Sequence, residues 1–203
     1  MSMMPKIVRH LKGYGEFVRR SLISPAAHAL HTRAQDAAYG TVTIVLICVL
    51  MSLLVYGYVG TLFSWLTSPF LLDTGFRMNY FQIFLRSLFL LLIAFAVLAW
   101  AMVFACRLMR SPQTIGDVVA RLGASLNVPA ALCLLSALLA LIGSYRLSGL
   151  FLLIALLGFG TSVGFTLYSF KRDHGGGLDA FYGTILSFVV SGAVLYVISQ
   201  LLI

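Results

Sequence analysis

Six acidic residues and four histidines are the side chains with which this sequence could perform acid–base catalysis or couple transport to an ion. Ion-coupled transporters and intramembrane hydrolases hold such groups at membrane depth. Here all of them fall in predicted loops or at predicted helix ends: Glu16, Asp36, Asp73, Asp117, Asp173, Asp179, His10, His28, His31 and His174. The zinc-protease, serine-hydrolase and nucleotide-binding motifs are absent as well. We therefore expect a non-enzymatic protein without catalytic residues, cofactors or metal ligands.

One polar segment, residues 169–183, gathers cations, carboxylates and aromatic rings between two apolar stretches. We take five of its residues as a candidate interaction surface: Lys171, Arg172, Asp173, Asp179 and Tyr182. Each also has a structural role open to it. Asp179 can cap the helix that follows, and the two cations suit the C-terminal end of the helix before them and anionic lipid.

Small residues recur at helical spacing in the second half of the chain. Gly158, Gly160 and Gly164 are the clearest set and include one glycine pair four residues apart. Small residues let membrane helices approach closely, where lipid supplies no hydrophobic drive for association. The set predicts helix packing within the bundle, with a homodimer face or a lipid groove as the alternatives.

Arg86 is the one charge expected inside a membrane span. Its long stem can reach the headgroups from about two turns inside the span. A pair with Asp73 and a contact to a substrate are the other roles considered.

The amino-acid composition is that of a protein embedded in a lipid bilayer. Of 203 residues, 61% are hydrophobic and 10% are charged, whereas a soluble domain carries about 25% charged residues. The net charge of +8 comes from basic residues beside apolar stretches, so we expect anionic headgroups as partners and no nucleic acid. The first forty residues show no signal-peptide pattern.

The predicted fold is an all-α membrane bundle in one domain. Five spans are expected at about 41–66, 80–105, 126–144, 148–170 and 180–202, after an N-terminal arm over 1–40. The arm begins with an interfacial amphipathic helix whose apolar face holds Ile7, Val8, Leu11, Tyr14, Val18 and Leu22. Before the third span, Thr114 and Asp117 predict a capped helix start, residues 115–124 turn or kink into the span, and Pro129 falls in its first turns.

The basic residues give the bundle an orientation. Eleven of them fall on the side of the N-terminal arm and three on the other. The eleven are Lys6, Arg9, Lys12, Arg19, Arg20, Arg33, Arg107, Arg110, Arg121, Lys171 and Arg172, and the three are Arg77, Arg86 and Arg146. The positive-inside rule predicts a multi-pass plasma-membrane protein with its N-terminus in the cytoplasm and its C-terminus outside.

Three segments resemble the Yip-domain superfamily, in particular its bacterial branch of largely uncharacterised five-span proteins. They are residues 117–129 (DVVARLGASLNVP), 168–173 (YSFKRD) and 178–183 (LDAFYG). The resemblance implies a five-helix membrane domain with a cytoplasmic N-terminus and no catalytic residues. The Asp-Leu-Tyr-Gly-Pro motif of the GTPase-binding eukaryotic branch and the zinc ribbon of many bacterial relatives are absent. Some bacterial relatives are assembly partners of ABC-type exporters or act in defence against toxic peptides.

These features predict a protein that acts by binding other membrane components: lipid, another membrane protein or a second copy of itself. The alternative function is a small-molecule or lipid transporter or channel. A water-lined cavity would favour that alternative, and a lateral groove open to lipid would favour lipid binding.

Overall fold

The computed structural model describes residues 4–67, 80–111, 113–172 and 177–202. The elements in these ranges are α1 (Met4–Ile23), α2 (Pro25–His31), the 3-10 helix η1 (Ala34–Asp36), α3 (Ala37–Thr67), α4 (Tyr80–Leu108), α5 (Ile115–Leu141), α6 (Tyr145–Lys171) and α7 (Ala180–Leu202). Five stretches are long and apolar enough to cross a membrane: Ala34–Val59, Phe81–Leu108, Ile115–Leu141, Tyr145–Lys171 and Ala180–Ile198. The chain is an all-α multi-pass membrane protein, so the predicted fold class is confirmed.

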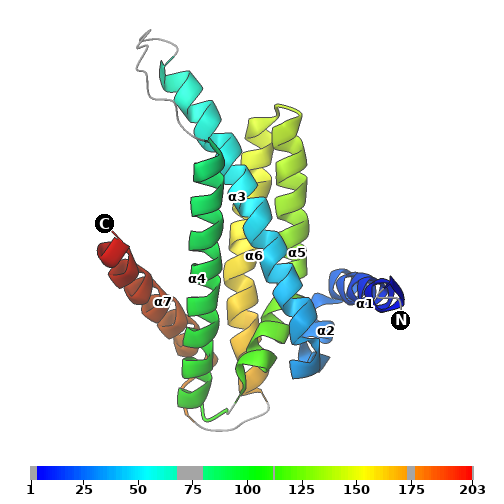
Figure 1. Cartoon of the computed structure of the whole chain (residues 1–203). Helices are drawn as coiled ribbons and strands as arrows, with labels where there is room; N and C mark the ends of the chain where they lie inside the picture. The colour runs from blue at the N-terminus through cyan, green and yellow to red at the C-terminus, as the bar shows by residue number, and fades with distance from the viewer. Residues whose placement is uncertain (1–3, 68–79, 112, 173–176, 203) are drawn as a thin grey trace.

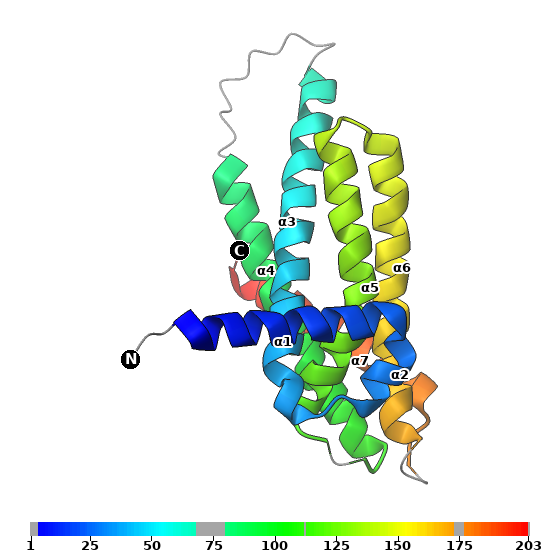
Figure 2. The same cartoon turned by 90° about the vertical axis from the view of Figure 1, so that its right-hand side faces the viewer.

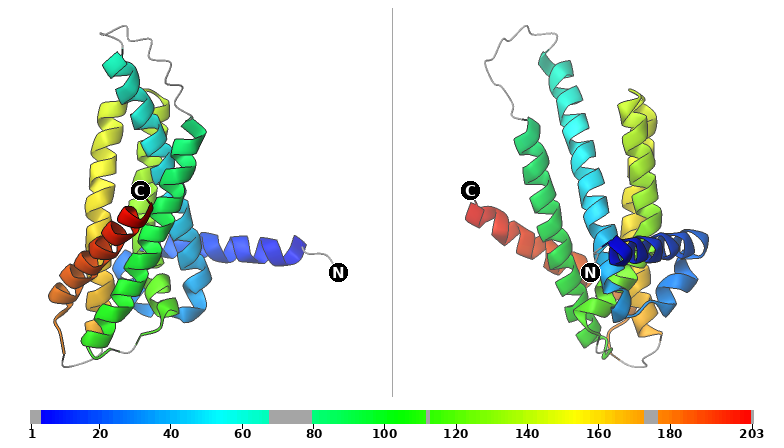
Figure 3. Two further views of the ribbon diagram at one scale, coloured as in Figure 1. Left: turned by 60° about the vertical axis from the view of Figure 1, so that its left-hand side comes forward. Right: turned by 45° about the vertical axis from the view of Figure 1, so that its right-hand side comes forward.

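Four of the long helices, α3 to α6, run side by side (Figure 1). Helix α1 crosses this bundle almost at right angles, near the end where α2 and η1 lie (Figure 2). Helix α7 starts at that same end and leans away from the bundle, and its C-terminal end stops short of the level of the α5–α6 turn (Figure 3). We call the end that carries α2, η1 and the start of α7 the basic end, because the predicted cytoplasmic cations belong to it.

The third span departs from the prediction. Thr114 and Asp117 form the expected capping box, but α5 then runs without a break from Ile115 to Leu141. Residues 115–124 are part of this helix, and Pro129 lies deep inside it instead of in its first turns. The predicted span start at about 126 was wrong, because the amphipathic piece 115–124 continues into the apolar stretch as one helix.

The structure accommodates Pro129 through α6. A proline within a helix cannot donate to the carbonyl four residues earlier, which here belongs to Ser125. The Ser162 hydroxyl of α6 lies within donating distance of that carbonyl, at 3.1 Å, and shares its proton with the Gly158 carbonyl of its own helix, at 2.8 Å. The ring lies against Gly158, where an added Cβ would come within 3.2 Å of the proline Cγ. Two small residues of α6 therefore compensate for the proline in α5.

The N-terminal arm is packed onto the bundle. Phe17 and Ser21 of α1 are buried, and the Phe17 ring packs against Tyr14 and Tyr39. Leu22, which was assigned to the apolar face, is 45% exposed. The side of α1 that meets the bundle is centred on Phe17, and the contact of Leu22 with the membrane interface stays a prediction. At the next helix start, Pro25 opens α2 as predicted, whereas the Ser24 side chain makes no cap hydrogen bond.

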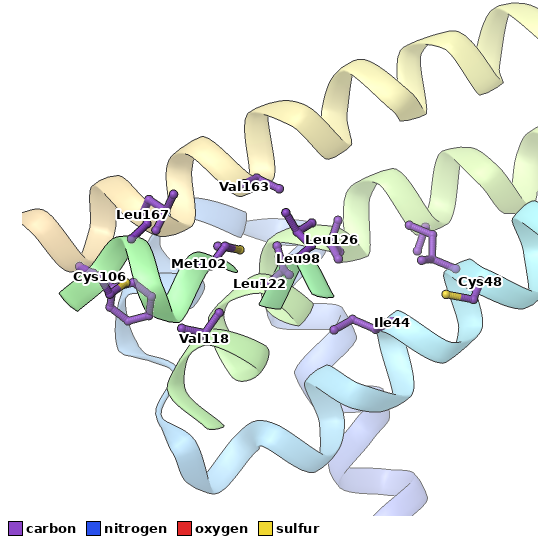
Figure 4. Close-up of a cluster of buried hydrophobic side chains, with 14 of the residues drawn as sticks. Ile44, Cys48, Leu98, Met102, Cys106, Val118, Leu122, Leu126, Val163 and Leu167 are labelled. Carbon is purple, nitrogen blue, oxygen red and sulfur yellow. The ribbon is translucent and has the colours of Figure 1, made fainter. Parts of the chain in front are cut away.

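The hydrophobic core lies in the half of the bundle nearer the basic end (Figure 4). It joins α3, α4, α5 and α6 through Ile44, Cys48, Leu98, Met102, Cys106, Val118, Leu122, Leu126, Val163 and Leu167. Toward the other end, α5 and α6 are held by a reciprocal pair in which the Ser136 and Ser148 hydroxyls each donate to the other's carbonyl at 2.8 Å.

The closest helix crossing in the described chain joins α3 to α5. A Cβ built on Gly123 would lie 2.2 Å from the Gly40 Cα, and one on Gly40 would lie 2.4 Å from the Val119 carbonyl oxygen. The two backbones touch, so only glycine fits at both positions. The sequence prediction missed this pair because Gly40 and Gly123 both fell outside the predicted spans, which began at about 41 and 126.

Candidate functional site

An apolar cavity of about 340 Å³ lies among the five long helices. Residues from α3 to α7 line it: Ile47, Met51, Leu91, Ala94, Phe95, Leu98, Cys133, Ala155, Leu156, Phe159, Phe188, Ser191, Gly192 and Leu195. The lining residues Leu156 of α6 and Phe188 of α7 are 49% and 40% exposed, so we place the mouth of the cavity between these two helices. A lateral opening between two spans faces the hydrocarbon of a bilayer.

The course of α7 produces this cavity. Near the start of α7, a Cβ on Gly183 would come within 2.8 Å of the sulfur of Met109, the residue just after α4, so the end of α4 and α7 lie in close contact there. The next residue of α7, Thr184, is in ordinary contact with Gly164 of α6. Beyond that point α7 leans outward (Figure 3), and Gly192 has nothing within 4 Å of an added Cβ. The space left between the diverging helices is the cavity.

Three phenylalanine rings from different helices meet at the cavity wall. Phe159 of α6 packs edge-on against Phe95 of α4, with ring centroids 5.3 Å apart. It also packs against Phe188 of α7 at 6.4 Å. Edge-to-face pairs of this kind favour fixed ring positions. The wall is therefore built by side chains that hold one another in place, so the cavity does not depend on a single loose side chain.

The cavity wall offers hydrocarbon and almost no hydrogen-bonding capacity. The Ser191 hydroxyl, its one oxygen-bearing side chain, donates to the Ser187 carbonyl of its own helix at 2.6 Å. Such a wall binds through shape and dispersion contacts and cannot position a reacting polar group. Elsewhere in the described part of the chain, no three His, Cys, Asp or Glu side chains come together as possible metal ligands.

The predicted interaction surface lies at the basic end. Lys171 ends α6 and is half-buried, Arg172 follows it and is exposed, and Tyr182 is 61% exposed on the first turn of α7. Asp179 caps α7 as expected, accepting a hydrogen bond from the Phe181 amide at 2.8 Å. Asp173 lies outside the described residues.

The loop before α7 is fixed to the end of α4. The Leu178 amide donates to the Leu108 carbonyl at 3.2 Å. Gly177 precedes it with φ +75°, and a Cβ there would come within 2.8 Å of the same carbonyl oxygen. The Ser111 hydroxyl donates to the Phe170 carbonyl at 3.2 Å, so the segment that follows α4 also meets the last turn of α6. The ends of α4 and α6 and the start of α7 therefore form one surface.

The three candidate glycines of α6 have separate surroundings. Gly158 contacts Pro129 of α5, Gly164 contacts Thr184 of α7, and Gly160 has nothing within 4 Å of an added Cβ. They do not form one close-packed helix face. On the side of α6 that carries Gly158, a second and more open hollow of about 320 Å³ lies between α2, α5 and α6.

Arg86 is exposed on the second turn of α4, and it is not among the residues that line the cavity. Its proposed partner Asp73 lies outside the described residues.

Arg121 was assigned to a loop by the sequence analysis, but it lies within α5 and is partly buried. Its guanidinium sits 4.3 Å from the centroid of the Phe170 ring and donates to the Ser169 hydroxyl at 3.1 Å. It also donates to the Thr32 carbonyl at 3.4 Å. Arg121 thus joins the N-terminal arm, α5 and α6.

A buried polar chain went unrecognised. The Thr43 hydroxyl donates to the Asn127 side-chain oxygen at 3.2 Å and lies 3.3 Å from the Tyr14 hydroxyl. Asn127 was the available signal, because an amide within an apolar span needs a partner. The chain links α1, α3 and α5, and its role is to hold the arm on the bundle.

Residues 13–202 match the family model described as a domain of unknown function, DUF6574, and the chain belongs to this family. No curated protein and no solved structure matches the chain.

Proposed function

We propose that this DUF6574 protein is a non-enzymatic membrane protein that binds lipid, with one acyl chain entering the cavity between α6 and α7. The observation that supports the proposal is the cavity itself: an apolar space of about 340 Å³ with a lateral mouth. Its volume falls in the range of roughly 300–1,000 Å³ that is usual for ligand pockets.

The volume of the cavity favours an acyl chain of a lipid over a helix of a partner protein as its occupant. A helix with side chains is about 10 Å across. A cylinder of that width holds 340 Å³ in about 4 Å of length, which is less than one helical turn of about 5.4 Å. A partner helix would therefore have to displace α7, whereas a flexible hydrocarbon chain fits the existing space.

The lining also favours lipid over a polar transported solute. Among the described residues, the wall carries no charged group, and its one hydroxyl is already hydrogen-bonded. A polar solute would lose its hydration there without compensation. Lipid binding therefore explains the cavity better than the small-molecule channel that was the alternative function.

Three further expectations belong to this proposal. The first is a plasma-membrane location with the basic end and the N-terminus in the cytoplasm and the C-terminus outside, supported by the distribution of cations. The second is the relation to the Yip-domain superfamily, supported by the three segments quoted above. The third is association with a membrane protein or a second copy, which the lipid-exposed helix faces permit.

The proposal is tested by filling the cavity with an added side chain. Gly192→Leu places an isobutyl group in the cavity, and nothing within 4 Å obstructs its Cβ. Gly57→Leu in α3 is the matched control, because Gly57 also has nothing within 4 Å of an added Cβ and does not line the cavity. Lipid bound to the protein in mild detergent is counted by native mass spectrometry.

We expect the wild type and the Gly57→Leu control to retain one tightly bound phospholipid each, and Gly192→Leu to lose most of it. Equal retention by all three proteins, or no retained lipid in the wild type, would show that the cavity is not a lipid site.

A further inference from the structure

The cavity wall selects poorly among lipids. An acyl chain that moves from the bilayer into the cavity exchanges one hydrocarbon environment for another. It therefore gains packing contacts and no hydrophobic free energy. Selection has to come from the polar part of the same lipid. The inference below rests on the proposed function and concerns where that headgroup binds.

The basic end lies one leaflet away from the cavity. Along α4, nine residues separate the lining residue Leu98 from Arg107, or about 14 Å at 1.5 Å per residue. Along α6, twelve residues separate Phe159 from Lys171, or about 18 Å. One leaflet contributes about half of the roughly 30 Å hydrocarbon core. A lipid with its chain in the cavity therefore has its phosphate at the level of these cations.

The surface of α6 between the two places is open. Leu156 at the mouth, Gly160, Gly164 and Lys171 lie within about 80° of one another around the helix, at 100° per residue. A Cβ at Gly160 would meet nothing within 4 Å, and one at Gly164 would make only ordinary contacts with Thr184. Leu167 lies on the same stripe and is fully buried, so an acyl chain from the basic end passes beside the exposed Tyr168 instead. From Gly164 to the mouth it meets no bulky side chain on the stripe.

The basic end offers groups that suit a phosphate and the glycerol region next to it. Arg107 and Arg110 at the end of α4 and Arg172 after α6 are exposed, and the contacts Ser111–Phe170 and Leu178–Leu108 hold these two helix ends together. Guanidinium groups bind phosphate through paired hydrogen bonds.

Aromatic side chains mark the same level. Phe181 and Tyr182 on the first turn of α7 are 68% and 61% exposed, and Tyr168 near the end of α6 is 60% exposed. Exposed aromatic rings gather where hydrocarbon meets headgroups. The carboxylate of Asp179 lies at this end too, but it accepts a hydrogen bond from the Phe181 amide as the cap of α7.

We propose that the cavity and the basic end are the two halves of one site for an anionic phospholipid of the adjacent leaflet. One acyl chain runs along α6 into the cavity, and the phosphate lies among Arg107, Arg110 and Arg172. Lys171 lies on the stripe between the two halves and adds to the positive field.

The test compares two headgroups on identical chains. Dioleoyl-phosphatidylglycerol and dioleoyl-phosphatidylcholine are titrated separately onto the full chain in detergent, and dissociation constants are measured by native mass spectrometry. The triple variant Arg107→Gln, Arg110→Gln, Arg172→Gln removes the cations, which are exposed, so folding should persist. Arg146→Gln is the control, because Arg146 is exposed at the opposite end of α6.

We expect the wild type and Arg146→Gln to bind phosphatidylglycerol at least about tenfold more tightly than phosphatidylcholine, since each surface cation contributes about 1 kcal/mol, or roughly fivefold, toward anionic lipid. The triple variant should bind the two lipids equally. Gly192→Leu should weaken both.

Three results would overturn the inference in distinguishable ways. If the triple variant keeps its preference for phosphatidylglycerol while Gly192→Leu still weakens both lipids, the chain site stands and the headgroup site is wrong. If the triple variant loses its preference while Gly192→Leu has no effect, the cations bind lipid at the surface without the cavity. If neither variant differs from the wild type, both proposals are wrong.

Discussion

Glycine serves opposite purposes on the two sides of this bundle. Where α3 crosses α5, Gly40 and Gly123 bring the two helix backbones into contact. A Cβ on Gly123 would lie 2.2 Å from the Gly40 Cα. Where α7 diverges from the bundle, Gly160 and Gly192 have nothing within 4 Å of an added Cβ. The first pair closes the space between two helices, and the second pair leaves space open.

The difference shows where the membrane bundle has a fixed structure and where it can bind. Helices in lipid gain little hydrophobic free energy from association, so van der Waals contact and interhelical hydrogen bonds decide which faces stay together. The α3–α5–α6 side has both, including the hydroxyl contact from Ser162 to the carbonyl freed by Pro129. The α6–α7 side makes contact near the start of α7 and then separates. It is therefore the side at which lipid can enter.

The largest effect is expected from a side chain at the closed crossing. Gly123→Leu forces the α3 and α5 backbones apart, so we expect a loss of stability at or beyond the roughly 3 kcal/mol upper end that is usual for overpacking. The thermal unfolding midpoint in detergent measures it. Gly192→Leu introduces the same side chain on the open side and should leave the midpoint nearly unchanged. Equal midpoints for the two variants would remove the distinction between the two sides.

A smaller effect is expected where α6 compensates for the proline. Ser162→Ala leaves the Ser125 carbonyl without its donor and should cost about 1 kcal/mol, in the range of interhelical hydrogen bonds in membranes. In a Pro129→Ala background the residue at 129 donates to that carbonyl, so the same substitution should cost almost nothing. A double-mutant cycle of unfolding free energies measures the coupling. Additive effects would mean that the two residues act independently.

The smallest effect concerns the stability of the contact between the N-terminal arm and the α3–α5–α6 side of the bundle. His28 lies edge-on against Phe17 with ring centroids 5.1 Å apart, and its buried Nε2 has no hydrogen-bond partner among the described residues. Burial lowers the pKa of His28 below its ordinary value, and the nearby Arg20 lowers it further. The folded arm therefore binds this proton less readily than the unfolded arm.

Stability from neutral His28 is fully present above the ordinary histidine value of about 6.5 and is lost as the pH falls through the lowered pKa of the folded form. The protection factors of the amides in α1 and α2, which correct exchange for its intrinsic rate at each pH, should therefore fall between pH 7.5 and 5.5. His28→Gln should remove most of this change, whereas His31→Gln, at an exposed position, should keep it. Protection factors in the wild type that stay constant over this pH range would show that the arm does not depend on His28.

The sequence predicted the parts of the fold that depend on composition and local signals. Five apolar stretches indicated five spans, and the start of α7 at Ala180, with Asp179 as its cap, followed from the residue types alone. Residues whose role depends on a partner helix were misassigned. Arg121 was counted as a loop cation because nothing local shows that Phe170 lies beneath it. Pro129 was placed at a helix start because the compensating Ser162 lies on another helix.

The cavity was the least predictable feature. Gly160 and Gly164 pointed toward α6 as a packing face or a groove, but the same residues can serve either purpose. Which of the two applies depends on the angle at which α7 leaves the bundle, and no local sequence signal specifies that angle. The candidate residues of the basic end were recognisable from their types, whereas their position one leaflet from the cavity required the structure.

Quenching of a tryptophan inside the cavity by brominated acyl chains tests the central claim most directly. With Trp65 and Trp100 replaced by phenylalanine, Phe95→Trp reports from the cavity wall in vesicles of phosphatidylglycerol brominated along its chains. We predict strong quenching that Gly192→Leu largely abolishes and Gly57→Leu leaves intact. Fluorescence of Phe95→Trp that brominated chains leave unchanged would contradict the claim that a lipid chain occupies the space between α6 and α7.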